Sequence, residues 1–218
     1  MIRDNIINAV EREQIIAILR GLSQEQCISV AQALYEGGIR MIEVTFNQKS
    51  PESFVTTADS IRAINQHMGD KILVGAGTVT SAALVNLAAD AGAKYIISPD
   101  VNTRVIEQTR NRDLVSMPGA MTPSEVMTAH VAGADFVKLF PAATLGAAYL
   151  KAIRAPLSHV KFLAVGGIHA GNAREFLDAG ACGLGIGGNL TKKDWINNKE
   201  FDKISEAARE IVQAVRGK

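Results

Sequence analysis

The feature that most constrains the fold is an alternation of short apolar segments with longer amphipathic ones, which continues to the end of the chain. The short segments are rich in Ile, Val, Leu and Phe, as strands buried on both faces are. Such an alternation predicts a parallel sheet whose strands are joined by helices. We expect strands at residues 15–20, 39–45, 71–78, 94–99, 113–119, 135–141, 161–167 and 181–188.

The amphipathic segments predict one helix before the first strand and one helix after each strand. The later helices are expected at about 23–38, 51–67, 81–91, from 103, from 122, and at 146–155, 171–179 and 199–216. Ser23 is a plausible N-cap, and Thr122, Pro123 and Glu125 fit a capping box with proline at the first helical position. The count favours one α/β domain over residues 1–218, a (β/α)8 TIM barrel with an extra N-terminal helix, over a doubly wound open sheet.

Composition and charge exclude several classes of protein. The formal net charge is +1, and Lys and Arg are scattered without interleaved aromatic residues, so we expect no nucleic-acid partner. No apolar segment approaches the ~18 residues that suggest a spanning helix, so we expect no membrane partner and a cytoplasmic location. The two cysteines, Cys27 and Cys182, match no metal or redox spacing and are expected to be buried free thiols.

No motif for a metal or a nucleotide cofactor emerges. The four histidines are dispersed and none pairs with an acidic residue at metal-ligand spacing, so we expect no metal. The segment from Gly183 to Gly188 matches G-x-G-x-x-G, but too little chain follows it for the βαβ unit that a dinucleotide site requires. We therefore expect no cofactor.

Lys138 stands apart from the other lysines near strands. A barrel of this kind places its active site at the carboxyl ends of its strands. Lys71, Lys94 and Lys161 lie at the starts of their strands, where solvent at the opposite rim explains them, whereas Lys138 lies inside one.

The alternation of side chains along a strand predicts where Lys138 points. Phe136, Lys138 and Phe140 share one face, and Val137 and Leu139 share the face that suits the outer helices. Lys138 should therefore point into the barrel, where burial would lower its pKa and make a neutral nucleophilic amine available. The alternative is a structural ion pair, for which arginine is the better choice.

Glu43 is predicted to point inward by the same argument, since Met41, Glu43 and Thr45 share a face. A buried carboxylate is costly unless it is paired or used, and Glu43 could be a general acid/base. The alternative is a buried ion pair with Arg20 on the adjacent strand, or with Lys138. Arg20 itself could bind a substrate carboxylate with both ends of its guanidinium group.

Other residues at the carboxyl ends of strands are candidates for binding substrate. Thr78 and Pro99 either line the pocket or serve as ordinary turn residues. Glycine pairs follow the seventh and eighth strands, where barrels of this type usually bind phosphate through backbone N–H groups. Close packing of a turn would also require glycine. These glycines are Gly166, Gly167, Gly187 and Gly188.

Taken together, these segments resemble the bacterial 2-keto-3-deoxy-6-phosphogluconate / 4-hydroxy-2-oxoglutarate aldolase family. The resemblance extends over nearly the whole chain in order. It rests on ILRG (18–21), EGGIRMIEVT (36–45), VGAGTV (74–79), ISP (97–99), PGAMTPSE (118–125), VKLFPA (137–142), AVGGI (164–168) and IGG (186–188).

The resemblance implies a lyase that cleaves a keto acid through a lysine Schiff base on Lys138, with Glu43 as general acid/base and no metal. It implies a small-molecule keto acid substrate and a homotrimer of barrels. Substrate contacts are implied at Arg20, Thr45, Asn47, Thr78, Pro99 and Phe140, and phosphate contacts at Gly166, Gly167, Gly187, Gly188 and Asn189.

Two positions depart from the pattern of the phosphogluconate-type members. Those members usually carry an arginine shortly after the glutamate of the second strand, whereas this chain has Asn47, closer to the phosphogalactonate aldolases. Lys49 is a candidate to replace that arginine. Asn189 stands where a serine often begins the phosphate-binding turn. Both changes concern the choice of substrate and leave the lysine chemistry as it is.

The expected reaction is cleavage of a 2-keto-3-deoxy-6-phospho sugar acid to pyruvate and glyceraldehyde 3-phosphate, or of 4-hydroxy-2-oxoglutarate to pyruvate and glyoxylate. One alternative is a phosphosugar isomerase or epimerase that uses Glu43 as the base. Another is a non-catalytic phosphosugar-binding barrel, in which an inward Lys–Glu pair would cost stability without being used.

Overall fold

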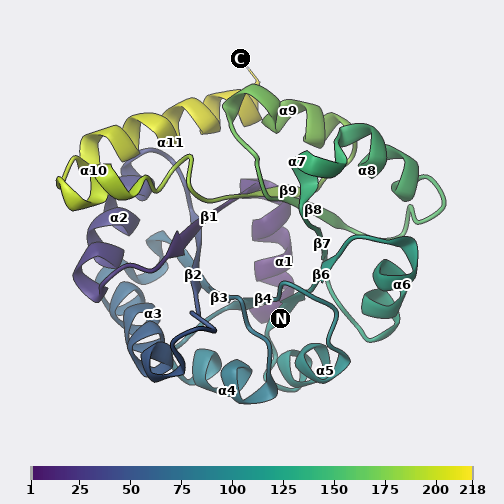
Figure 1. Ribbon diagram of the computed structural model, residues 1–218, viewed down its shortest axis with the longest axis horizontal. Helices are drawn as coiled ribbons and strands as arrows, with labels where there is room; N and C mark the ends of the chain where they lie inside the picture. The colour runs from purple at the N-terminus through teal and green to yellow at the C-terminus, as the bar shows by residue number, and fades with distance from the viewer. Residues whose placement is uncertain (1, 218) are drawn as a thin grey trace.

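The computed structural model describes residues 2–217 as a parallel barrel surrounded by helices (Figure 1). The expected strands are present, most of them shorter by one or two residues at one or both ends than the sequence predicted. The segment 113–119 forms two short strands in place of one. The strands are β1 (Ile15–Arg20), β2 (Met41–Thr45), β3 (Leu73–Gly77), β4 (Tyr95–Ile97), β5 (Val115–Met117), β6 (Gly119–Ala120), β7 (Val137–Leu139), β8 (Phe162–Val165) and β9 (Gly183–Ile186).

The barrel closes through the segment that contains β5 and β6. The order of hydrogen-bonded neighbours is β5-β4-β3-β2-β1-β9-β8-β7-β6, all parallel. Because β5 and β6 are separated only by Pro118, one segment pairs with β4 on one side and with β7 on the other. The Lys138 backbone N–H donates to the Pro118 carbonyl oxygen at 2.9 Å, so pairing continues across the break. The expectation of a TIM barrel over an open sheet is confirmed.

The helices form a ring outside the strands. Two short α-helices were not predicted. One, α7, lies directly before the expected helix 146–155, and the other, α10, lies before the last helix. The helices are α1 (Ile2–Glu13), α2 (Gln24–Glu36), α3 (Phe54–Met68), α4 (Ala82–Asp90), α5 (Thr103–Asn111), α6 (Pro123–Val131), α7 (Ala142–Leu145), α8 (Ala147–Arg154), α9 (Ala170–Asp178), α10 (Lys193–Asn197) and α11 (Phe201–Arg216).

The predicted caps are present at two helices. At α2 the Ser23 side chain accepts from the Gln26 N–H, and at α6 the Thr122 side chain accepts from the Glu125 N–H, each within a reciprocal capping box. The Glu125 carboxylate also accepts from the Met121 and Thr122 N–H groups, and these bonds lower its pKa. Local sequence therefore fixes where these two helices begin.

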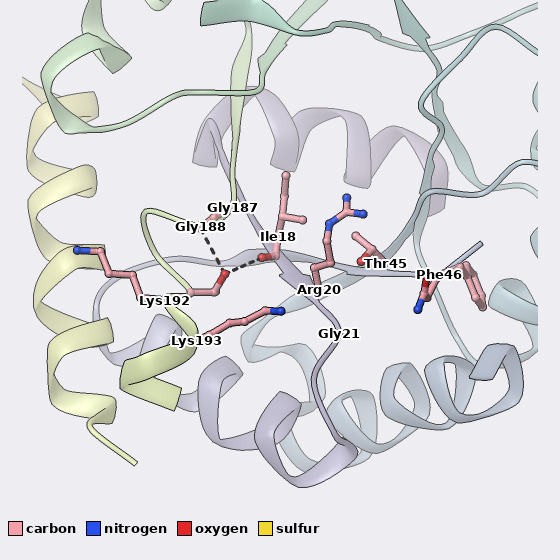
Figure 2. A pocket seen from close by; sticks show the side chains of 11 residues that line it. Ile18, Arg20, Gly21, Thr45, Phe46, Gly187, Gly188, Lys192 and Lys193 are labelled. Atoms are coloured by element: carbon pink, nitrogen blue, oxygen red, sulfur yellow. Dashed lines mark hydrogen bonds between the residues drawn. The ribbon is translucent and has the colours of Figure 1, made fainter. Parts of the chain in front are cut away.

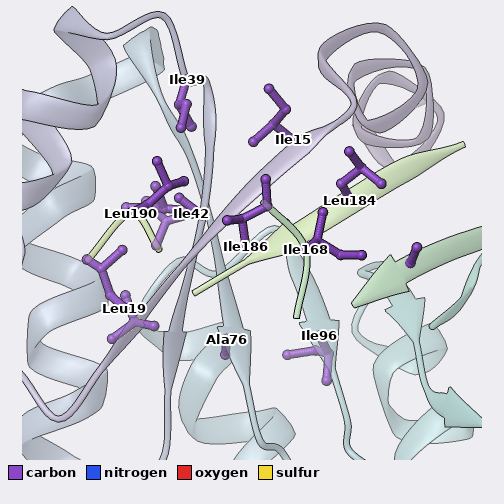
Figure 3. Packing of buried hydrophobic residues seen from close by; sticks show 14 of the residues in the cluster. Ile15, Leu19, Ile39, Ile42, Ala76, Ile96, Ile168, Leu184, Ile186 and Leu190 are labelled. Carbon is purple, nitrogen blue, oxygen red and sulfur yellow. The ribbon is translucent and has the colours of Figure 1, made fainter. Parts of the chain in front are cut away.

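The strands separate two apolar clusters, one inside the barrel and one between the barrel and the helices. Val137 and Leu139 belong to the outer cluster, whereas Phe136 belongs to the inner one. Ile42 and Val44 likewise face outward, and Met41 faces inward. Figure 3 shows outer-cluster side chains of β1, β2, β3, β4 and β9 packing along the strands. The predicted facing of the strands that carry Lys138 and Glu43 is confirmed.

Helix α1 lies across the end of the barrel opposite the carboxyl ends of the strands (Figure 1). Its Ile6 and Val10 belong to the inner cluster. Arg3 forms an ion pair with the buried carboxylate of Asp135, which also accepts from the Ser116 N–H at 2.9 Å. The N-terminal helix thus covers that end of the barrel and contributes side chains to its inner cluster.

The described residues contain no helix that is both long and apolar enough to cross a bilayer. Both thiols are free; Cys27 is buried and Cys182 is half-buried. Burial raises the pKa of the Cys27 thiol to about 11, so it is protonated at neutral pH.

Gly75 on β3 makes room for an aromatic ring inside the barrel. The Tyr95 side chain is fully buried, and its hydroxyl donates to the carbonyl oxygen of Ile42. A Cβ atom at residue 75 would lie 2.1 Å from Tyr95 Cε2 and 2.2 Å from Cδ2. A buried ring that also holds a hydrogen bond cannot move away easily, so Gly75 is required by packing.

We predict that Gly75→Ala destabilises the fold by about 1–3 kcal/mol, the usual cost of overpacking a core, which lowers Tm by about 2–12 °C in a chain of this size. Thermal unfolding followed by circular dichroism measures this. The matched variant is Gly77→Ala on the same face of the same strand, where the nearest atom is the flexible end of a side chain. Equal Tm values for Gly75→Ala and the wild type would contradict the packing argument.

Candidate active site

The carboxyl ends of the strands surround a cavity of about 370 Å³, called here the catalytic cavity. It brings together eleven of the thirteen residues that the sequence singled out, from seven different strands or the loops after them. Ile18, Val165, Ile168 and Gly185 complete the wall. The predicted residues in it are Arg20, Glu43, Thr78, Pro99, Lys138, Phe140, Gly166, Gly167, Gly187, Gly188 and Asn189.

Lys138 lies on β7 and points into the catalytic cavity. The residue is only 7% exposed, and its Nζ lies 4.9 Å from the centre of the Phe140 ring. Burial lowers the pKa of the Lys138 amine from its usual 10.5, the positive charge of Arg20 lowers it further, and the negative charge of Glu43 opposes both. The protein therefore favours the neutral, nucleophilic amine more than water does.

Glu43 lies on β2 and is 2% exposed. Burial raises the pKa of its carboxyl group, and the positive charges of Lys138 and Arg20 partly offset this. Within residues 2–217, Glu43 and Lys138 form no direct ion pair within 4.0 Å, although each changes the pKa of the other. The geometry therefore favours a site with space between the two groups over a closed structural ion pair.

The place of the Glu43 carboxyl group depends on a glycine. A Cβ atom at Gly77 on β3 would lie 1.6 Å from Glu43 Oε1 and 2.3 Å from its Cδ. Since Gly77 has no side chain, the carboxyl group can lie over β3. The sequence analysis did not single out Gly77 as part of the site, although this glycine lies in the segment VGAGTV (74–79).

The glycine pair after β8 and the glycine pair after β9 require the absence of a side chain for different reasons. Gly166 and Gly167 have φ values of +99° and +76°, and a Cβ at Gly167 would lie 2.6 Å from the Ala143 Cβ. Backbone conformation and packing explain them. Gly187 and Gly188 have no positive φ, and a Cβ there would meet nothing closer than 3.8 Å. Their missing side chains instead leave space in the cavity, as expected where a ligand approaches the backbone.

Asn189 and Thr78 are held by loop contacts. The Asn189 Nδ2 donates to the Ile168 carbonyl oxygen at 3.0 Å, which joins the loop after β9 to the loop after β8.

Thr78 has a φ of +56°, a left-handed conformation that is rare for a β-branched residue. Gln48 holds it there: its Nε2 donates to the Thr78 carbonyl oxygen at 2.8 Å, and its Oε1 accepts from the Thr80 hydroxyl at 3.0 Å. No pattern along the chain pointed to Gln48.

Thr45 and Asn47 line a second cavity of about 440 Å³, called here the outer pocket, and not the catalytic cavity. The Thr45 hydroxyl donates to the Leu19 carbonyl oxygen at 3.2 Å. Figure 2 shows residues that line the outer pocket. The two cavities share Ile18, Arg20, Gly187 and Gly188, so the outer pocket adjoins the catalytic one.

Two lysines also line the outer pocket, and neither of them is Lys49, the lysine that the sequence suggested. Lys192 and Lys193, from the loop after β9 and the start of α10, are among the lining residues of the outer pocket, whereas Lys49 lines neither cavity. Lys193 is the first residue of α10, a helix that the sequence did not predict.

Within residues 2–217, no three His, Cys, Asp or Glu side chains gather in a way that could hold a metal ion. The polar groups that face the catalytic cavity are an amine, a carboxyl group, a guanidinium group and backbone amides. Such a set can form an imine with a carbonyl compound, transfer protons and bind anions.

We predict that Gly77→Ala lowers turnover of the keto acid on the order of 10²-fold, because the new methyl group displaces the Glu43 carboxyl group by more than 1 Å. Since that group is the flexible end of a side chain, Tm should fall by less than about 4 °C. Steady-state kinetics and thermal unfolding measure the two effects. Unchanged turnover would show that the position of Glu43 over β3 does not matter for the reaction.

We predict that reaction of Lys138 with pyruvate, trapped by cyanoborohydride, becomes faster as pH rises and levels off below 10.5, because the amine loses its proton at lower pH than free lysine does. In Glu43→Gln the rise should shift to lower pH, since the negative charge that raises the pKa of Lys138 is removed. Glu107→Gln, at an exposed residue, is the control. A shift to higher pH in Glu43→Gln would contradict the proposed coupling.

The family of the chain follows from its similarity to known proteins. The family model "KDPG and KHG aldolase" matches residues 6–207. The chain is 32% identical over 203 residues to 2-dehydro-3-deoxy-6-phosphogalactonate aldolase of Escherichia coli K12, with 93% of this chain and 94% of the relative covered. It is 34% identical over 194 residues to the KHG/KDPG aldolase of the same strain, with coverage of 88% and 87%.

A solved structure extends the likeness to the fold. The KDPG aldolase of Legionella pneumophila, with pyruvate captured as a covalent carbinolamine intermediate, superposes with a TM-score of 0.84 at 27% identity. The match covers 94% of this chain and 97% of that one. The family model and the curated relatives agree over most of the chain, and the chain belongs to the KDPG and KHG aldolase family of lyases.

Proposed function

We propose that this enzyme cleaves a 2-keto-3-deoxy-6-phospho sugar acid to pyruvate and glyceraldehyde 3-phosphate through a Schiff base on Lys138. The observation that carries the proposal is the buried Lys138 amine, with its pKa lowered, facing the same cavity as the buried Glu43. The same chemistry extends to 4-hydroxy-2-oxoglutarate, which would give pyruvate and glyoxylate. Captured pyruvate in the Legionella relative supports the covalent step.

The first step forms the imine. The neutral Nζ of Lys138 attacks the C2 carbonyl carbon of the substrate and gives a carbinolamine. Glu43, whose pKa burial raises, would protonate the departing hydroxyl group as a general acid, and water would leave. The protonated imine that remains draws electrons from the adjacent C3–C4 bond.

The second step breaks the carbon–carbon bond. The Glu43 carboxylate takes the proton from the C4 hydroxyl, directly or through a water. The C4–O bond becomes a carbonyl group, and the electrons of the C3–C4 bond move to the imine. The aldehyde product leaves, and Lys138 holds the enamine of pyruvate. Protonation at C3 and hydrolysis of the imine by water release pyruvate and restore the amine.

The remaining residues position the substrate. Arg20 would bind the carboxylate of the keto acid, and Thr78, Pro99 and Phe140 would contact the carbon chain next to Lys138. Backbone N–H groups of the glycine pairs after β8 and β9 would hold the phosphate, with Asn189 keeping the two loops together. Thr45 and Asn47 would contact the substrate only from the outer pocket.

An isomerase or epimerase would need Glu43 as a base and would use Lys138 only for its charge. The lowered pKa of Lys138 speaks against that role, because it favours the uncharged amine. A binding protein would keep two buried ionisable groups without a direct ion pair, at a cost in stability. Both observations support the aldolase.

We also propose one (β/α)8 domain over residues 1–218, a cytoplasmic location and a homotrimer. The exposed side chains of Met121 and Phe140, which are 44% and 42% exposed, support an assembly. The two lie on neighbouring strand ends, since the Phe140 N–H donates to the Ala120 carbonyl oxygen at 3.1 Å. A partner barrel would cover this apolar surface.

We predict that pyruvate and borohydride add covalent mass at Lys138, located by peptide mass spectrometry. Lys138→Met should abolish trapping and lower cleavage of the phosphorylated keto acid by at least about 10³-fold, because no other buried amine faces the cavity within the described residues. Lys161→Met, at the opposite rim, is the control. Trapping at another lysine, or cleavage retained by Lys138→Met, would sink the proposed function.

A further inference from the structure

The outer pocket carries more positive charge than the proposed mechanism uses, since that mechanism employs Arg20 alone. Three cations line it, namely Arg20, Lys192 and Lys193, and none of its lining residues carries a carboxylate. Within the part of the chain described, residues 2–217, none of the three cations forms a direct ion pair. The whole chain has a net charge of only +1, so this local excess is a property of the pocket and not of the molecule. A concave surface with uncompensated positive charge favours an anionic ligand.

The two neighbouring lysines differ in direction. Figure 2 shows the Lys193 side chain extending across the pocket toward Gly21 and Arg20, while Lys192 extends away from it. The Lys192 Nζ lies 4.3 Å from the centre of the Trp195 ring, a cation–π contact. Lys193 is therefore the cation that is free to meet a ligand, and Lys192 is its natural control.

The loop that presents Lys193 is attached to the first strand. The Thr191 hydroxyl lies 3.1 Å from the Ile18 carbonyl oxygen and 3.3 Å from that of Gly187, shown as dashed lines in Figure 2. The Leu190 and Thr191 N–H groups also donate to the Gly187 carbonyl oxygen. These contacts hold the loop after β9 beside β1. Gly187 and Gly188 of this loop line both cavities, whereas Lys193 lines the outer pocket and not the catalytic cavity.

We propose that Lys193 binds the phosphoryl group of the substrate from the outer pocket and thereby determines specificity for phosphorylated keto acids. A phosphate monoester is close to a dianion at neutral pH, and backbone N–H groups offer it only partial charges. Gly187 and Gly188 leave open space next to both cavities, and Lys193 supplies a full charge on their outer side. Asn47, which lines the same pocket, cannot supply that charge. The inference rests on the proposed function and names the residue that selects its substrate.

The test compares two substrates in four proteins: wild type, Lys193→Ala, Lys193→Arg and Lys192→Ala. For the phosphorylated keto acid, Lys193→Ala should raise KM by about 10-fold or more with kcat changed less than threefold, as expected when a binding contact remote from the reaction is lost. KM for unphosphorylated 4-hydroxy-2-oxoglutarate should stay within twofold. Lys193→Arg should keep most of the affinity, and Lys192→Ala should resemble the wild type. The difference between wild type and Lys193→Ala should shrink at high salt.

Three outcomes would overturn the proposal: an unchanged KM in Lys193→Ala, an equal rise in KM for both substrates, or the same effect in Lys192→Ala. A second measurement does not depend on turnover. Inorganic phosphate should raise Tm of the wild type and of Lys192→Ala, and should raise that of Lys193→Ala markedly less. Failure of pyruvate trapping at Lys138 would overturn the proposed function, whereas equal phosphate-induced shifts in all three proteins would overturn the role of Lys193 alone.

Discussion

The whole site depends on the closure of the parallel sheet by one chain segment. Residues 115–120 pair with β4 through β5 and with β7 through β6, so the strands have a single interior. Closure gives every alternate residue of a strand an inward direction. It thereby removes Lys138 and Glu43 from water, and burial is the largest cause of the pKa shift of each. Helix α1 packs over the opposite end with Ile6 and Val10, and the reactive groups face the catalytic cavity at the carboxyl ends of the strands.

The interior divides into a packed part and a reactive part, and β3 shows how. Gly75 and Gly77 occupy equivalent inward positions two residues apart. The first accommodates the ring of Tyr95 and the second the carboxyl group of Glu43. Near the closed end an aromatic side chain fills the space and contributes to stability. Near the open end a titratable group takes the space that apolar packing would otherwise use, so the site is built at some cost to the core.

Strand periodicity could predict much of this site. Alternation along 135–141 and 39–45 fixed the inward direction of Lys138 and Glu43, and capping boxes fixed the starts of α2 and α6, because these are local rules. Alternation alone did not show that the Thr45 hydroxyl bonds to β1 or that Thr45 lines the outer pocket and not the catalytic cavity. The contributions of Gln48 and Lys193 depend on loops that meet across the barrel mouth, and no pattern along the chain encodes such a meeting.

The glycines illustrate why a motif alone leaves its cause open. Four glycines follow β8 and β9, and the sequence could not separate tight turns from phosphate binding. The backbone angles and neighbours separate them: Gly166 and Gly167 are needed by conformation, whereas Gly187 and Gly188 adopt angles open to any residue and face empty space. A residue that costs entropy and that packing does not need is best explained by a ligand that occupies the space left free. In this barrel that space joins the catalytic cavity to the outer pocket, which is where a substrate long enough to reach both would place its anionic end.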